Sequence, residues 1–208
     1  RKLFQFRFGE DSEFAGHNFG NLFITAMTQL TGDFEQAIKE SSKVLAIRGH
    51  VIPSTLHKVN LVAHYNDGSQ LQGEAKIPHK GMPIHRVFLN PQDSAATPEA
   101  LSAIKNADII LLGPGSLFTS IIPNLLIKEI TAAIVSSPAL KFYVCNIMTQ
   151  HGETDNFSAS DHLKVLIKHS HPQIINYCLI NTGSISAELL EKYKGEQASL
   201  VRPDIDII

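Results

Sequence analysis

Small and hydroxyl-bearing residues gather directly after a short apolar run near the middle of the chain. The run over residues 108–112 reads Asp-Ile-Ile-Leu-Leu and leads into Gly-Pro-Gly-Ser over residues 113–116. Two glycines let the backbone approach a ligand closely, and N–H groups with a helix dipole form an anion site suited to phosphate. A plain tight turn with a serine N-cap is the alternative interpretation, and the pattern alone leaves both open. The candidate ligand residues are Gly113, Gly115, Ser116, Thr119 and Ser120.

A second polar segment, residues 146–155, follows the next predicted strand. Amide and hydroxyl side chains can read the edges of a base or a sugar, and Glu153 could bind sugar hydroxyls. A solvated loop followed by a helix cap is the alternative. Ligands bind at the carboxyl ends of strands in open α/β sheets, so two such loops in succession favour a site. The candidate residues are Asn146, Thr149, Gln150, Glu153 and Thr154.

Two further polar segments have a similar composition. His17, Asn18 and Asn21 stand at the start of the first predicted helix, where an anionic ligand would be favoured. Helix capping is the alternative, and for Asn18 it is sufficient by itself. Residues 181–184, Asn-Thr-Gly-Ser, follow the third predicted strand and are again small and polar.

Several other chemistries find no support in the sequence. The ten histidines form no HxxxH pair with a matching carboxylate, so neither a metal site nor a metal cofactor is predicted. Residues 113–117 lack the second glycine of a GxSxG elbow, and a Walker phosphate loop is absent. Glu153, Asp155 and Asp161 are carboxylates near the proposed site, but no residue is an obvious general base beside a nucleophile. No catalytic residue is therefore predicted.

Composition limits the possible partners. A formal net charge of −2 gives no reason to expect nucleic acid or an anionic membrane. Hydrophobic residues make up 43% of the 208, enough for a sizeable core. No apolar run approaches the roughly 20 residues of a membrane helix. Cys145 and Cys178 lie in apolar, strand-like segments and are predicted to be buried free thiols, which fits a reducing, cytoplasmic compartment.

Hydrophobic spacing predicts two helices and then short strands. Apolar residues recur at helical spacing over 18–31 and 34–45, with Thr-Gly-Asp between them as a stop and a new N-cap. Asn66-Asp67-Gly68 is typical of a hairpin turn. Alternation over residues 59–65 predicts one wetter face. We therefore expect an antiparallel insertion over about residues 48–90, and its predicted strands are residues 51–52, 59–65, 71–77 and 84–89.

The remaining residues alternate between helix and strand, which predicts a largely parallel sheet. The strand over 108–112 is expected to be buried on both faces. The predicted helices are residues 98–106, a stretch reaching about 137, 158–169 and 186–194. The other predicted strands are residues 140–145, 174–180 and 198–201. Residues 1–8 resemble the end of a helix already under way.

Three long blocks resemble the YvcK/CofD-like family. They are residues 15–22, 107–120 and 144–155, and shorter matches support them at residues 42–45, 51–55 and 86–89. The bacterial YvcK branch fits better than the 2-phospho-lactate transferases. The resemblance implies one Rossmann-like nucleotide-binding domain over residues 1–208, with a largely parallel sheet, helices on both of its faces and the small antiparallel insertion.

The resemblance also implies a ligand. In the YvcK branch the ligand is a UDP-sugar such as UDP-N-acetylglucosamine or UDP-glucose, and Tyr193 matches a tyrosine that is used against it. The implied role is regulatory, linking gluconeogenic growth, cell-wall precursor supply and cell shape, with a regulated enzyme as partner and a homo-oligomer compatible with it. The alternative is a transferase of the CofD type that acts on a nucleotide-diphosphate donor.

The sequence departs from the family pattern in three places. The family's first strand and Gly-rich loop should precede Arg1, and a ligand-contacting arginine should follow Ile208. The chain is therefore expected to be a fragment that lacks the first strands and binds ligand weakly or not at all. His151 stands where the family usually has proline, so the loop around it is expected to be more mobile.

Overall fold

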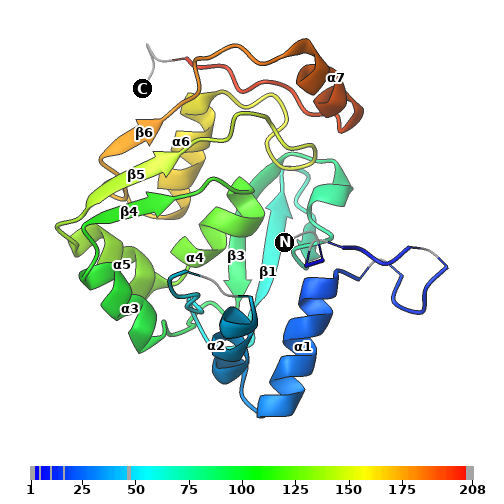
Figure 1. Ribbon diagram of the computed structural model, residues 1–208. Helices are drawn as coiled ribbons and strands as arrows, with labels where there is room; N and C mark the ends of the chain where they lie inside the picture. Colours follow the sequence, from blue (N-terminus) through cyan, green and yellow to red (C-terminus); the bar gives the residue numbers. More distant parts are fainter. Residues whose placement is uncertain (1–2, 5, 10, 16, 46–47, 205–208) are drawn as a thin grey trace. The chain divides into compact units, whose positions relative to one another are not determined.

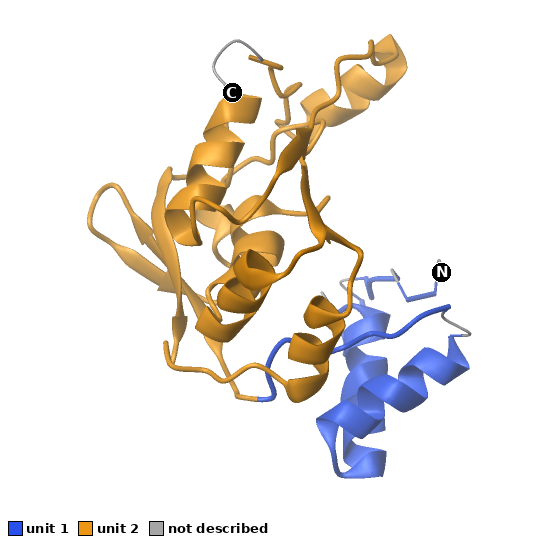
Figure 2. Cartoon of the chain, turned by 90° about the vertical axis from the view of Figure 1, so that its left-hand side faces the viewer, with its two compact units in different colours: residues 1–56 blue, residues 57–208 orange. Residues whose placement is uncertain are grey.

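A computed structural model describes residues 3–4, 6–9, 11–15, 17–45 and 48–204. The chain divides into two compact units, residues 1–56 and residues 57–208 (Figure 2). The second unit contains the antiparallel strands. It also contains the strands and helices that alternate after them.

The first unit is a pair of helices, α1 (Phe19–Thr31) and α2 (Phe34–Val44). Both follow from their caps. The Asn18 side chain accepts the Gly20 N–H at 2.8 Å, and Gly32 ends α1 in the left-handed conformation at φ 72°. Asp33 then caps α2 through the Gln36 N–H at 2.7 Å. The two predicted helices are confirmed.

The expectation that the segment before α1 is the end of a helix is wrong at Arg7. This residue forms an antiparallel bridge to Asn18. Phe8 and Phe19 add backbone hydrogen bonds to His17 and Phe6 in the same segment. An extended pairing has replaced the expected helical turn there, while Arg1, Lys2 and Gln5 lie outside the described residues.

An antiparallel sheet in the order β2-β1-β3 confirms the predicted insertion. Its strands are β2 (Gln70–Gln72), β1 (Asn60–Tyr65) and β3 (Ile84–Asn90). The hairpin turn closes with the Gly68 N–H on the Tyr65 carbonyl at 3.0 Å. A short 3₁₀ helix, η1 (Pro78–Lys80), precedes β3.

Three details of the insertion differ from expectation. Residues 51–52 form no strand, and β2 ends at Gln72 because Gly73 takes a positive φ of 111°. Val62 is only 6% exposed although it alternates with the buried Leu61 and Ala63. Both faces of β1 are covered at that point, so the predicted wetter face is absent at Val62.

The parallel sheet runs in the order β4-β5-β6, and Figure 1 shows these strands side by side in chain order. They are β4 (Ile109–Leu112), β5 (Leu140–Val144) and β6 (Tyr177–Leu179). The helices between them are α3 (Pro98–Lys105), α5 (Lys128–Ser136) and α6 (Ala159–His169), and α7 (Ala187–Gly195) follows β6. This mixed α/β arrangement confirms the predicted fold class.

The helical stretch expected up to residue 137 is divided. A π-helical turn, η2 (Leu117–Ile121), leads into the short α4 (Ile122–Leu125), and α5 begins only after the extended Ile127. Of the described residues, no single helix is long and apolar enough to cross a membrane. Residues 117–125 and 128–136 reach that length and apolar content only together, across a 76° bend.

One face of the parallel sheet carries exposed apolar side chains. Ile109 and Leu111 are 56% and 60% exposed, so the expectation that this strand is buried on both faces is wrong. The register places Leu140, Tyr177 and Leu179 on the same face, and they are exposed too. The opposite face buries Lys141, Tyr143 and Leu112.

The predicted strand over residues 198–201 does not join the sheet. Leu200 forms an isolated antiparallel bridge with Met148, and Arg202 forms a parallel bridge with Ser158. The Thr149 N–H donates to the Ser199 carbonyl at 2.7 Å. Residues 199–204, called here the C-terminal strap, thus lie along the loop that follows β5.

Candidate functional site

The two polar loops predicted at strand ends meet each other. They are neighbours because β4 and β5 pair in parallel, with Leu112 beside Tyr143 at their carboxyl ends. The Gly115 N–H donates to Asn146 Oδ1 at 3.3 Å, and Asn146 Nδ2 donates back to the Gly115 carbonyl at 2.8 Å. This reciprocal pair fixes the turn over residues 113–116 against the loop over residues 146–155.

A second connection runs through side chains. The Ser116 hydroxyl donates to Gln150 Oε1 at 2.6 Å, and Gln150 Nε2 donates to Glu153 Oε1 at 2.8 Å. Ser116 occupies the N-cap position of η2 but makes no capping hydrogen bond. Its hydroxyl is directed to the neighbouring loop, so the capping alternative does not describe this serine.

Glu153 takes the place of a cap. It is 3% exposed, and its Oε2 accepts the Phe118 N–H at 3.2 Å while Oε1 accepts the Thr119 hydroxyl at 2.9 Å. Burial raises the pKa of Glu153, and the hydrogen bonds from Thr119 and Phe118 partly oppose this rise. The start of η2 therefore already holds a carboxylate of the protein itself.

The three candidate threonines are buried and support the loop. Thr154 is 1% exposed, and its Oγ1 accepts the Gln150 N–H at 2.9 Å. Thr149 Oγ1 lies 3.1 Å from Ser199 Oγ and accepts the Ser199 N–H at 2.9 Å. Thr119 is bound to Glu153, as described above. The other candidate side chains of the two loops, apart from Glu153, remain partly exposed: Ser116, Ser120, Asn146 and Gln150.

The two glycines of the turn differ in what they require. Gly113 has φ 90°, and a Cβ there would lie 3.0 Å from the Val144 carbonyl oxygen and 3.1 Å from Ile121 Cδ1. A Cβ on Gly115 would make only an ordinary contact, 3.5 Å from Ser120 Cβ. The turn conformation therefore depends on glycine at position 113. A pocket of about 320 Å³ lies beside the turn, and the residues with polar side chains in its lining are Ser120 and Asn124.

The loop over residues 146–155 is held by its own close contacts. Gly152 has φ 77°, and a Cβ on it would lie 1.8 Å from the Pro78 carbonyl oxygen of η1. The Gly152 N–H donates to Asp155 Oδ2 at 2.7 Å, and His151 Nδ1 lies 3.0 Å from Asp155 Oδ1. His151 thus forms an ion pair with Asp155 when it is protonated.

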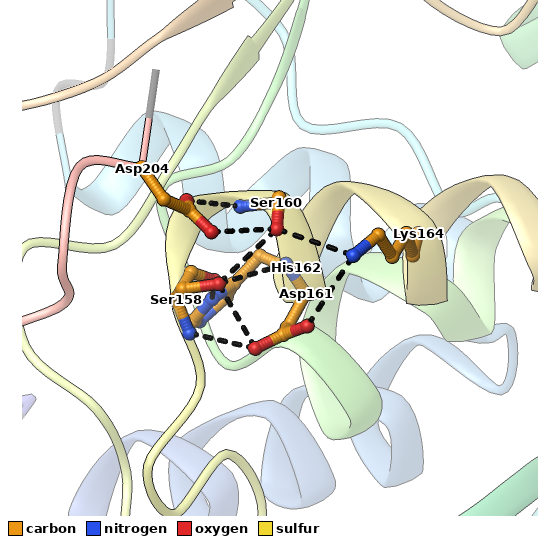
Figure 3. Close-up of polar contacts among 6 residues, drawn as sticks. All are labelled: Ser158, Ser160, Asp161, His162, Lys164 and Asp204. Atoms are coloured by element: carbon orange, nitrogen blue, oxygen red, sulfur yellow. Dashed lines mark hydrogen bonds and ion pairs between the residues drawn. The ribbon is translucent and has the colours of Figure 1, made fainter. Parts of the chain in front are cut away.

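The C-terminal strap is tied to the start of α6 (Figure 3). Ser158 caps α6 in a capping box with Asp161. Asp204 accepts the Ser160 N–H at 2.9 Å and its hydroxyl at 2.7 Å. The hydrogen bonds from Ser160 hold the pKa of Asp204 well below its usual range. The sequence analysis did not predict the contact between Asp204 and Ser160. The Ser-x-x-Asp spacing of Ser158 and Asp161 is a sequence signal for the capping box alone.

The other candidates come from other segments of the chain. Asn18 caps α1, as the capping alternative held, and it belongs with His17 and Asn21 to the unit over residues 1–56. Tyr193 lies on α7 and is half-buried. Among the described residues, no three His, Cys, Asp or Glu side chains come together as a metal site.

Fold and site together define an α/β protein whose glycine turn and amide-rich loop meet at the carboxyl edge of a parallel sheet. The family model described as "2-phospho-L-lactate transferase CofD" matches residues 1–208, and the chain belongs to this family.

Relatives with names and a solved structure agree with that membership. The chain is 45% identical to the "Gluconeogenesis factor" of Bacillus subtilis, over 98% of this chain and 64% of that protein. It is 47% identical to the "Gluconeogenesis factor" of Listeria innocua, over 90% of this chain and 58% of that protein. A crystal structure of a UPF0052 family member from Bacillus halodurans matches with TM-score 0.90 and 45% identity, over 99% of this chain and 67% of that one. The chain spans less than two thirds of the length of these two gluconeogenesis factors.

Proposed function

We propose that the protein binds a UDP-sugar, UDP-N-acetylglucosamine or UDP-glucose, and acts as a regulator without turnover of its own. The observation that carries the proposal is the reciprocal Gly115–Asn146 pair, which joins a glycine turn to an amide-rich loop at the carboxyl edge of the sheet. A turn suits a diphosphate, and partly exposed amide groups suit a base or a sugar.

The regulatory part of the proposal draws on the relatives. The relatives from Bacillus subtilis and Listeria innocua both carry the name gluconeogenesis factor. In this proposal, ligand occupancy reports sugar-nucleotide supply and is passed to a regulated enzyme that serves gluconeogenic growth, cell-wall precursor supply and cell shape. The free thiols of Cys145 and Cys178 suit a reducing compartment, and the proposal places the protein in the cytoplasm.

A transferase is the second candidate, because the matching family model is described as a 2-phospho-L-lactate transferase. The buried Glu153 carboxylate has its donors inside the protein, so it contributes no base at the turn. Product formation from a nucleotide-diphosphate donor would decide for the transferase. Tight binding without product would decide for the regulator.

Calorimetric titration of UDP-N-acetylglucosamine, UDP-glucose and GDP into the full-length protein tests the proposal. Gly113→Ala strains the turn, and we expect it to abolish binding of the uridine ligands. Gly9→Ala is the matched control, because nothing lies within 4 Å of the added methyl group and its φ is not positive. Binding of GDP alone, or equal binding by both variants, would contradict the proposed site.

A further inference from the structure

In its ionised form the Glu153 carboxylate accepts hydrogen bonds and cannot donate them. The groups around it are hydrogen-bond donors, as that form requires. A backbone N–H cannot reverse its polarity, and the Phe118 N–H points at Oε2 from 3.2 Å. The Thr119 hydroxyl lies 2.9 Å from Oε1. The carboxylate is 3% exposed, so donors from the protein replace the hydration that burial removes.

This carboxylate sets the orientation of the Gln150 amide. A glutamine side chain has one donating end and one accepting end. The end that lies 2.8 Å from Glu153 Oε1 must be the NH₂ group, because two acceptors cannot share a hydrogen bond. The carbonyl end of Gln150 therefore faces Ser116. The Gln150 N–H is held by Thr154 Oγ1 at 2.9 Å, which fixes the backbone beneath this side chain.

The orientation of Gln150 in turn decides what Ser116 offers. A serine hydroxyl has one proton and two lone pairs. Its proton lies in the 2.6 Å hydrogen bond to Gln150 Oε1. The half-buried Ser116 Oγ thus presents lone pairs to any ligand at the turn.

We propose that Glu153, acting through Gln150, makes Ser116 a hydrogen-bond acceptor, so that the ligand group placed against Ser116 is a donor such as a sugar hydroxyl or an amide N–H. Glu153 and Gln150 are positioning residues in this relay, and Ser116 determines specificity. The inference rests on the proposed function for its ligand, but the relay itself exists without one. Phosphate oxygens are directed away from Ser116 Oγ, because two acceptors repel each other.

The relay is tested first without ligand. In ¹H–¹⁵N spectra of the full-length protein, the Gln150 side-chain amide is assigned by its loss in Gln150→Leu. We expect its proton shifts to be those of a group that donates to a carboxylate, and to move in Glu153→Gln. Ser136→Ala, which removes a serine hydroxyl bound to the Ala132 carbonyl of α5, should leave them in place. Proton shifts typical of a solvent-exposed side-chain amide would overturn the relay, and so would shifts that Glu153→Gln leaves unchanged.

The ligand step uses Ser116→Ala, a small change at a half-buried position, with two probes. Inorganic pyrophosphate carries acceptors for this site, and UDP-N-acetylglucosamine adds hydroxyl and amide donors. We expect Ser116→Ala to weaken the UDP-sugar about 3- to 10-fold, as loss of one hydrogen bond does, and to leave pyrophosphate within about 2-fold. Equal weakening of both probes would overturn the assignment of Ser116 as an acceptor.

The failure of the inference is distinguishable from that of the proposed function. If the wild-type protein binds no UDP-sugar, the proposed function fails, and the amide spectrum alone decides the relay. If Glu153→Gln does not fold, the comparison between wild type and Ser116→Ala still decides it. The Gln150 amide should keep its orientation toward Glu153 in Ser116→Ala, and a changed orientation would contradict the order of the relay.

Discussion

Both carboxylate oxygens of Asp204 accept hydrogen bonds from Ser160, one from its N–H at 2.9 Å and one from its hydroxyl at 2.7 Å (Figure 3). Ser160 lies in the first turn of α6, where backbone N–H groups lack helical partners and negative charge is favoured. The C-terminal strap therefore supplies hydrogen-bond acceptors to the first turn of a helix that lies 44 residues earlier in the chain.

We expect Asp204→Asn to lower the melting temperature of the full-length protein at pH 7. The variant loses the charge at the helix start and turns an NH₂ group toward one of the two Ser160 donors. Because the pKa of Asp204 is lowered in the folded state, its stabilisation is present above the ordinary aspartate range and is lost as pH falls through the folded value.

Asp93→Asn is the matched control for this variant. Asp93 forms an exposed ion pair with Lys128 at 2.7 Å, and such surface pairs contribute little. Thermal melts should separate the two variants at pH 7 and bring them together in strong acid. Equal melting temperatures at pH 7 would contradict the role of Asp204.

Ser158→Ala should destabilise the protein by about 1 kcal/mol, the usual cost of losing an N-cap. Ser158 Oγ accepts the Asp161 N–H at 3.3 Å and donates to Asp161 Oδ2 at 2.9 Å. Urea unfolding measures the change. Ser158→Thr, which keeps the hydroxyl, should recover most of the loss, and a threonine as destabilising as alanine would mean that packing rather than capping matters there.

Gly152→Ala should destabilise the loop over residues 146–155 more than a positive φ alone would. A methyl group at Gly152 would lie 1.8 Å from the Pro78 carbonyl oxygen, so η1 and the loop must separate. Gly68→Ala is the control, because its φ of 83° carries the same strain while nothing lies within 4 Å. We expect about 1 kcal/mol for Gly68→Ala and clearly more for Gly152→Ala in urea unfolding. Equal losses of unfolding free energy in the two variants would show that η1 moves away from the added methyl group without further destabilisation.

The fold was predictable where the relevant interactions are local. Asn18 and Asp33 were recognised in the sequence as possible caps, and both stand one residue before the helices that they start. Ser158 and Ser186, where two predicted helices began, are the N-caps of α6 and α7. The meeting of the two polar loops followed from parallel pairing, which places neighbouring carboxyl ends at one edge.

The remaining features depend on contacts between distant residues. Glu153 was expected at the ligand, but it lies buried against Phe118, which is 35 residues away in the chain. The strap was predicted as a strand because residues 198, 200 and 201 are apolar, yet Leu200 and Arg202 form bridges with Met148 and Ser158 rather than with the sheet. Periodicity indicates which side chains are apolar. It does not indicate which distant groups form hydrogen bonds with the polar ones.

Acidification below neutral pH should destabilise the protein through His169. Its Nδ1–H donates to the Val165 carbonyl at 2.8 Å, and Nε2 accepts the Val87 N–H at 3.1 Å, so both nitrogens are used in the neutral form. Burial lowers the pKa of His169, and Lys168, Arg86 and His85 lower it further. The unfolded state therefore binds a proton first, and stability is lost as pH falls from about 6.5 toward the folded pKa.

The loss from His169 has an upper limit of about 1.4 kcal/mol per pH unit. His162 adds to it, because burial lowers its pKa as well, while the raised pKa of Glu153 acts in the opposite sense. Urea unfolding between pH 7.5 and 5.5 should therefore show a steeper loss in wild type than in His169→Gln, where the other two groups are unchanged. His79→Gln, at an exposed position, should follow wild type. Parallel pH profiles for wild type and His169→Gln would mean that the Val87 hydrogen bond survives protonation, and that the neutral imidazole is not what joins α6 to β3.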